Sequence, residues 1–208
     1  MTRILLIRHG VTDWLEQDLL HGISDIPLNK KGLIQARLTA DTFSEIKVDR
    51  LYSSPLSRAM QTAEEISKVV SMKIIPMEGL KEMDFGLMEG KRDYWRTFKR
   101  KPILLVFYIF TRLFSGFLSG ERFSRFKHRV VTAWNEILSE NPSGTIIIVT
   151  HSGVLRYILS HEFGGSPFFG PKFSLTPCGI TEIEWCPDGN IRMIEVSRDA
   201  HLIGDKSP

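Results

Sequence analysis

Residues 145–150, Thr-Ile-Ile-Ile-Val-Thr, form a run rich in β-branched side chains that leads directly into His151, Ser152 and Gly153. β-branched side chains favour strands, and a run without polar alternation suits a strand that is buried on both faces of a parallel sheet. The helical pattern of residues 153–159 follows at once. We therefore expect a central strand whose carboxyl end carries a histidine and leads into a helix.

The rest of the chain alternates short apolar runs with longer amphipathic stretches. Strands are expected at 4–7, 50–53, 73–76 and 145–150, and helices at 30–43, 55–70, 123–138 and 153–159. A hairpin is expected from 180–185 and 191–196, around the turn residues 187–190. Strands that alternate with helices predict an α/β fold, a three-layer α/β/α sandwich. Its sheet is expected to be mostly parallel, with one antiparallel strand at an edge.

Length and composition favour one globular domain. The chain has 208 residues, of which 42% are apolar and 25% charged, so a disordered or collagen-like protein is excluded. We expect a single domain over 1–208, with a helical cap inserted at about 91–121. The two cysteines, Cys178 and Cys186, are too few for a disulfide scaffold and indicate a reducing cytoplasm.

Charge and targeting signals narrow the set of partners. The chain carries 27 basic and 24 acidic residues, a net charge of +3, which does not indicate a nucleic-acid binder but favours anionic small molecules. The apolar run at 4–7 is too short for a secretory signal. The apolar run at 103–110 is closed off by Lys101 and Arg112. The ten residues between them would reach only about 15 Å as a helix, half of a bilayer core.

A second strand end carries the same kind of residues. Arg8, His9 and Gly10 follow the first predicted strand, and Arg58 lies just beyond the strand at 50–53. Ligand sites in open parallel sheets lie beyond the carboxyl ends of the strands. Guanidinium groups match phosphate oxygens in pairs, and an imidazole kept neutral at one nitrogen can attack phosphorus. One histidine alone is more often structural, but His9 and His151 at equivalent strand ends favour a phosphate site.

Five sequence blocks resemble the histidine phosphatase superfamily, also called phosphoglycerate mutase-like. The blocks are 6–12 (LIRHGVT), 24–32 (SDIPLNKKG), 53–63 (SSPLSRAMQTA), 80–90 (LKEMDFGLMEG) and 149–156 (VTHSGVLR). An Arg-His-Gly triplet alone would be a weak signal, whereas five blocks in the right order are specific. They span the chain except for the expected insertion.

The resemblance assigns a role to each residue of the expected site. His9 would be the nucleophile that becomes phosphohistidine. Arg8, Arg58 and His151 would neutralise the oxygens of the transferring phosphoryl group. Glu82 matches the general acid of the family, which would protonate the leaving oxygen and later deprotonate the attacking water.

Further assignments complete the expected site. The Thr12 hydroxyl and the Ser152 backbone N–H would add hydrogen-bond donors to the phosphate. The resemblance implies no metal and no cofactor, and the six histidines show no ligand spacing with cysteine or carboxylate. Asp84 and Glu89 lie near Glu82 and remain alternatives for the general acid.

The chain departs from the family pattern at two positions. Leu15 stands where the family often has an asparagine, and Leu19 stands where an arginine is common. These changes remove one amide donor and one cation, which either weakens phosphate binding or makes room for an apolar leaving group. His21 occupies a position usually held by glutamine and receives no role.

Three functions are compatible with these residues. A phosphatase is preferred, because the block at 83–90 resembles the branch that includes α-ribazole phosphatase and broad-specificity members. The substrate would be a small organic phosphate ester. A cofactor-dependent phosphoglycerate mutase is the enzymatic alternative. A non-catalytic phosphoester-binding module ranks below both, since it would be expected to have lost part of the catalytic set.

The expected insertion has its own composition. Seven of the thirteen phenylalanines fall between 98 and 126, and those at 107, 110, 114 and 117 share one helical face. The preferred interpretation is a cap helix packed on the domain, and an apolar pocket wall is the second. The third is that 96–118 docks on an anionic membrane surface or on a second subunit of a homodimer.

Overall fold

The computed structural model describes residues 1–92, 120–164 and 173–202. The expected cap insertion lies almost entirely outside these residues, together with the apolar run at 103–110 and the whole segment 96–118. Among the helices of the described ranges, none is long and apolar enough to cross a membrane.

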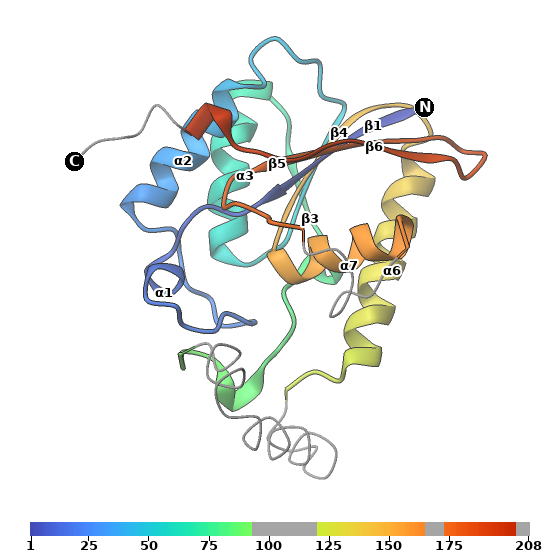
Figure 1. The fold of residues 1–208 in the computed structure, drawn as a ribbon. Coiled ribbons are helices and arrows are strands. Elements are labelled where there is room, and N and C mark those ends of the chain that lie inside the picture. Colours follow the sequence, from blue (N-terminus) through green and yellow to red (C-terminus); the bar gives the residue numbers. More distant parts are fainter. Residues whose placement is uncertain (93–119, 165–172, 203–208) are drawn as a thin grey trace.

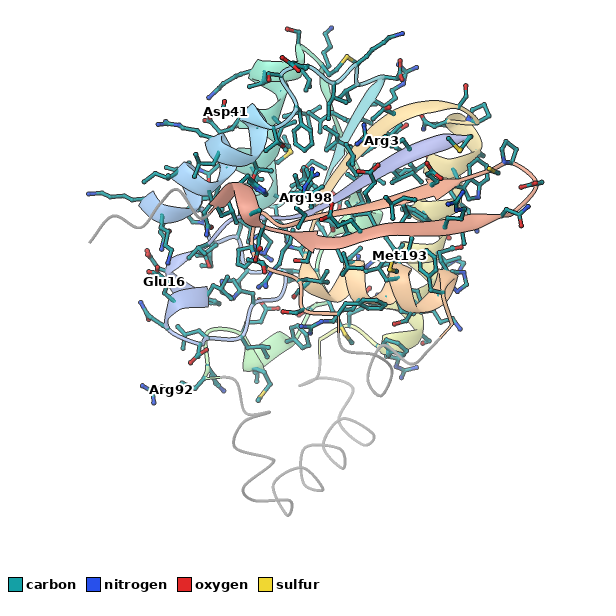
Figure 2. The ribbon with its side chains drawn as sticks, turned by 45° about the horizontal axis from the view of Figure 1, so that its top comes forward. Arg3, Glu16, Asp41, Arg92, Met193 and Arg198 are labelled. Carbon is teal, nitrogen blue, oxygen red and sulfur yellow. The ribbon has the colours of Figure 1, made fainter. Side chains whose placement is uncertain are left out.

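Six strands form one sheet in the order β3-β2-β4-β1-β5-β6. The strands are β1 (Thr2–Arg8), β2 (Arg50–Ser53), β3 (Ile74–Pro76), β4 (Gly144–Thr150), β5 (Ile180–Trp185) and β6 (Ile191–Arg198). The pairings β1–β4, β4–β2 and β2–β3 are parallel, whereas β5 pairs antiparallel with both β1 and β6. A mostly parallel sheet with antiparallel pairing at one edge is thus confirmed. Figure 2 shows Met193 and Arg198 on β6, at that edge.

Helices cover both faces of the sheet. The helices are α1 (Asp13–Glu16), α2 (Lys30–Asp41), α3 (Ser57–Val70), α6 (Phe123–Glu140) and α7 (Ser152–Glu162), with 3-10 turns η1 (Glu78–Leu80), η2 (Gly86–Met88) and η3 (Ala200–Leu202). In Figure 1, α2 and α3 lie on one face, and α6 and α7 lie on the other. The four helices predicted from the sequence are all present, and the fold is the expected α/β sandwich.

One predicted helix begins later than expected. The sequence predicts a start at Pro55, but α3 begins at Ser57. Leu56 is extended, with φ −68° and ψ 137°, and its backbone N–H donates to Ser54 Oγ at 3.3 Å. Residues 54–56 therefore form a turn that carries the chain from the end of β2 into the helix.

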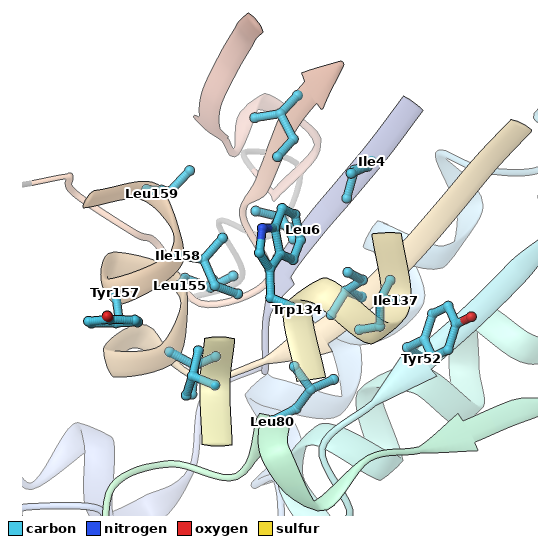
Figure 3. Close-up of a cluster of buried hydrophobic side chains, with 14 of the residues drawn as sticks. Ile4, Leu6, Tyr52, Leu80, Trp134, Ile137, Leu155, Tyr157, Ile158 and Leu159 are labelled. Atoms are coloured by element: carbon cyan, nitrogen blue, oxygen red, sulfur yellow. The ribbon is translucent and has the colours of Figure 1, made fainter. Parts of the chain in front are cut away.

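β1 is buried on both faces, as its unbroken apolar run predicts. Ile4 and Leu6 face α6 and α7, where they belong to one buried cluster with Trp134 (Figure 3). Leu5 and Ile7 belong to the cluster under α2 and α3. Because successive side chains of a strand point to opposite faces, this alternation places β1 at the centre of the core. The residues that follow β1 are consequently built on a rigid base.

Ile147 in the middle of β4 provides a test of this core. Its side chain is fully buried, so Ile147→Ala should lower the free energy of unfolding by about 2–5 kcal/mol, because it removes apolar contacts and leaves a cavity. Ile194→Ala, at a site that is 47% exposed on β6, should cost less than about 1 kcal/mol. Urea denaturation measures both values. Equal losses would contradict this placement of the core.

Candidate active site

The carboxyl ends of β1, β4 and β2 lie side by side at one edge of the sheet. His9, just after β1, donates its backbone N–H to Thr150 O at 2.9 Å, and Ser54, just after β2, donates to Val149 O at 2.9 Å. These bonds extend the parallel pairing by one residue beyond the strands. The rings of His9 and His151 consequently lie close together, with centroids 5.1 Å apart and planes inclined by 60°.

Hydrogen bonds assign the proton on each imidazole. His9 Nδ1 lies 2.8 Å from Gly10 O, and a carbonyl only accepts, so Nδ1 carries the hydrogen and Nε2 keeps its lone pair. His151 Nδ1 accepts from Arg58 Nε at 3.3 Å, so the proton of His151 resides on Nε2. That nitrogen lies 2.7 Å from Ser54 Oγ and donates to it.

Both histidines are neutral at pH 7. Burial lowers the pKa of His9 well below 6.5, and the charges of Arg58 and Arg8 lower it further. Burial also lowers the pKa of His151 well below 6.5, again with Arg58 as the strongest nearby charge. His9 therefore presents an unprotonated nitrogen among cations, which is the state required of a nucleophile.

Arg58 is completely buried and is held by the loop before α2. Its Nη1 donates to Ser24 O at 2.8 Å and its Nη2 donates to Gly22 O at 2.6 Å. Burial lowers the pKa of Arg58, while the carboxylate of Glu82 acts to raise it. The loop at 22–24 and His151 together fix the plane of this guanidinium.

Arg8 brings a second guanidinium to the end of β1. Its Nη1 donates to Leu175 O at 2.7 Å, whereas its Nε is a buried donor without a hydrogen-bond partner in the described part of the chain. Burial lowers the pKa of Arg8 to about 10, and the charge of Glu82 partly offsets this effect. Arg8 is thus charged at pH 7, and its unused donor can serve an anion.

Glu82 lies at the amino end of α7, beside His151. The carboxylate is 6% exposed, and it accepts from Met83 N at 3.0 Å and from Gly153 N at 2.9 Å. A Cβ on Gly153 would lie 2.2 Å from Glu82 Oε1, so only glycine allows this close approach. The sequence Ser152-Gly153 therefore both starts the helix and admits the carboxylate.

The other two candidate acids make bonds that order their own loops. Asp84 Oδ1 accepts from Gly86 N at 2.6 Å, at the start of η2. Glu89 ties two loops together by accepting from the backbone N–H groups of Ile23, Ser24 and Phe85 and from the Ser24 hydroxyl. Since the loop at 22–24 holds Arg58, Glu89 supports the guanidinium from outside. This geometry favours Glu82 as the acid.

The two additional donors expected from the resemblance differ in their surroundings. Thr12 is fully buried and its Oγ1 accepts from Leu15 N at 3.2 Å, so it caps α1. His21 Nδ1 donates to Leu19 O at 3.0 Å, and its Nε2 therefore accepts the Thr12 hydroxyl proton at 2.6 Å. That proton is directed at His21 in this structure. Ser152 is the first residue of α7, where backbone N–H groups have no partner within the helix.

Several groups that build the site have no predicted role in the sequence. Ser54 and Glu89 lie inside the resemblance blocks but received no structural role, and His21 proves to be next to Thr12 with its pKa lowered by burial to about 4. Arg129 on α6 donates to backbone carbonyls of the loop that carries Glu82, and it stands outside the blocks. Its only signal in the sequence is the pairing of a glutamate and an arginine eight residues apart.

Comparison with known proteins identifies relatives of this arrangement. A family model described as histidine phosphatase superfamily (branch 1) matches residues 4–195. The uncharacterized phosphatase PhoE of Bacillus subtilis (strain 168) is 30% identical over 204 residues, which cover 98% of each chain. The probable phosphoglycerate mutase GpmB of Proteus mirabilis is 26% identical and covers 99% of this chain and 96% of its own.

A solved structure adds a bound ligand to the comparison. Phosphoserine phosphatase from Entamoeba histolytica, crystallised with 3-phosphoglyceric acid, superposes with a TM-score of 0.79 at 25% identity. The match covers 97% of this chain and all of that one. The fold that carries the two histidines is therefore shared with an enzyme that binds a small phosphate ester.

The protonation of the two histidines is testable by NMR. Long-range ¹H–¹⁵N spectra of the ligand-free protein should show both rings neutral at pH 6, where an unperturbed histidine with a pKa of about 6.5 is mostly charged. His9 should carry its proton on Nδ1 and His151 on Nε2. A midpoint at or above pH 6.5 for either ring, or the opposite tautomer of His9, would contradict this description of the site.

Proposed function

The chain belongs to the histidine phosphatase superfamily, and from this premise we propose that it hydrolyses small phosphate monoesters through a phosphohistidine at His9. Relatives of this chain are named as phosphatases, and one is named as metal-independent, so the chain is an enzyme of this class rather than a non-catalytic module. The observation that supports the mechanism best is the neutral His9 imidazole beside His151, Arg8 and Arg58.

In the first step, the lone pair of His9 Nε2 attacks phosphorus and the ester P–O bond breaks. The Glu82 carboxylate takes a proton from the phosphate monoanion of the substrate, and the leaving oxygen receives this proton from Glu82. Arg8 donates to the phosphoryl oxygens from its unpartnered Nε. Arg58 provides further positive charge, and His151 orients this guanidinium by accepting from its Nε. Charge stabilisation of this kind is the main contribution of a protein to phosphoryl transfer.

In the second step, water attacks the phosphohistidine. The Glu82 carboxylate accepts one proton from the water, the P–N bond breaks, and His9 regains its neutral state. Glu82 returns this proton to the departing phosphate, so the cycle ends with the carboxylate with which it began and needs no other reactant. The carboxylate serves both steps from one place, because Met83 N and Gly153 N hold it beside His151.

We infer that the loops next to the site suit an ester with an apolar leaving group. Ile23 lies between the two residues whose carbonyls hold Arg58, and it is 43% exposed. Leu87 in η2 is 62% exposed and belongs to the segment that Glu89 ties to this loop. Leu15 and Leu19, which replace polar residues of the family pattern, add to the apolar character of the same part of the chain.

Phosphoglycerate mutase is the second candidate function, favoured by the similarity to the mutase relative of Proteus mirabilis. A mutase must return the phosphoryl group to its substrate before water reaches phosphohistidine. The block at 83–90 instead resembles the phosphatase branch, and a relative named as a phosphatase has the higher identity.

Glu82→Gln should separate the general acid from its neighbours. The variant cannot donate a proton, and the serine oxygen of phosphoserine is a poor leaving group unless it is protonated. Turnover of phosphoserine should therefore fall by about 10² or more. Turnover of p-nitrophenyl phosphate should fall much less, because nitrophenolate leaves without a proton. Asp84→Asn is the matched control and should keep both rates, while His9→Ala should lose both. Near-normal hydrolysis of phosphoserine by Glu82→Gln would move the acid role to another residue.

Incubation with 3-phosphoglycerate distinguishes the two candidate activities. We expect release of inorganic phosphate, followed with a colorimetric phosphate assay, without accumulation of 2-phosphoglycerate. Rapid isomerisation without phosphate release, seen by ³¹P NMR, would replace the phosphatase proposal with the mutase.

A further inference from the structure

Arg129 on α6 uses every N–H of its guanidinium on two partners, a carboxylate and the loop that carries Glu82. Its Nε and Nη2 each lie 2.8 Å from an oxygen of Glu121. Its Nη1 donates to Gly79 O at 3.0 Å and to Lys81 O at 2.6 Å, and its Nη2 also donates to Glu82 O at 2.8 Å. These five bonds equal the donor capacity of an arginine.

We propose that Arg129 is a positioning residue that sets the place of the Glu82 carboxyl group. The proposal rests on the role of Glu82 as the general acid. Arg129 binds the backbone carbonyl of Glu82 itself, and it binds the carbonyls of two of the three residues before it. The main chain of the acid is thus fixed to α6, while its carboxylate is fixed to the amino end of α7 by Gly153 N.

Close packing against α6 makes this connection stiff. A Cβ on Gly79 would lie 2.4 Å from the Cβ of Ala133 and 2.8 Å from Arg129 O, so the loop touches the helix backbone. The guanidinium also lies over the ring of buried Phe126, with its carbon 4.9 Å from the centroid. Neither the loop nor the arginine can shift without disturbing the other.

The charge of Arg129 is paired with Glu121, so the effect on Glu82 is one of placement. The side chains of Arg129 and Glu121 are only 22% and 9% exposed, which keeps the pair ordered. A misplacement of about 1 Å in a reacting group can cost about 10²-fold in rate. A lysine cannot replace the planar fork of five donors, although it keeps the charge.

The test compares leaving groups in Arg129→Lys. Displacement of the acid should raise the ratio of kcat/KM for p-nitrophenyl phosphate to kcat/KM for phosphoserine by about tenfold or more. Inhibition by vanadate, which probes the phosphate pocket, should stay within about threefold of the parent enzyme. Arg125→Lys, an exposed arginine on the same helix, is the matched control and should change neither value.

A second variant covers the case in which Arg129→Lys does not fold. Glu121→Gln keeps the arginine but weakens its anchor, and it should raise the same ratio to a smaller extent. Whichever variant folds, an unchanged ratio, or an equal loss on both substrates with weaker vanadate inhibition, would overturn the positioning role. If Glu82→Gln itself shows no preference for p-nitrophenyl phosphate, Glu82 is not the general acid, and the positioning role of Arg129 is then also wrong. A preference in Glu82→Gln without one in the folded variant would overturn this inference alone.

Discussion

Three parallel strands end at the same edge of the sheet because backbone hydrogen bonds continue their pairing past the last strand residues. The bonds from His9 N to Thr150 O and from Ser54 N to Val149 O place the residues that follow β1, β4 and β2 in one row. This pairing brings the two imidazoles and the turn that leads to Arg58 next to one another. Burial of β1 and β4 on both faces resists any sliding of this register.

Burial around this row also determines its electrostatics. Two guanidinium groups and two imidazoles share a small volume, so the histidines remain neutral and the arginines carry the positive charge. Arg58 connects the groups, because it donates to His151 with Nε and to the loop at 22–24 with its other nitrogens. The positive charges of the two guanidinium groups would attract a dianionic phosphoryl group to this part of the sheet edge.

The strand ends and the residues next to them could be predicted from the sequence because both signals are local. The β-branched run of β4, followed by His151, predicts a buried strand and the position of a candidate site residue at its end without any knowledge of the fold. The residues that hold the loops of the site could not be predicted in this way. Most partners of Arg129 and Glu89 are backbone carbonyls and N–H groups, which every residue has, so no pattern of side chains indicates these backbone partners.

Local signals were also insufficient where one side chain has two roles. Thr12 was expected to donate to phosphate, but its hydroxyl caps α1 and donates to His21, a contact that depends on how the loop folds back. Proline favours the first turn of a helix and so predicts that α3 begins at Pro55. In the structure the turn at 54–56 precedes α3, and Arg58 in its first turn donates to His151. In both cases the tertiary arrangement decides between locally acceptable alternatives.

The stereochemical course at phosphorus tests the central claim most directly. A substrate made chiral at phosphorus with oxygen isotopes should give phosphate with overall retention of configuration, because transfer to His9 and then to water inverts the centre twice. Overall inversion would mean that water attacks the ester in a single step, and it would contradict the phosphohistidine mechanism.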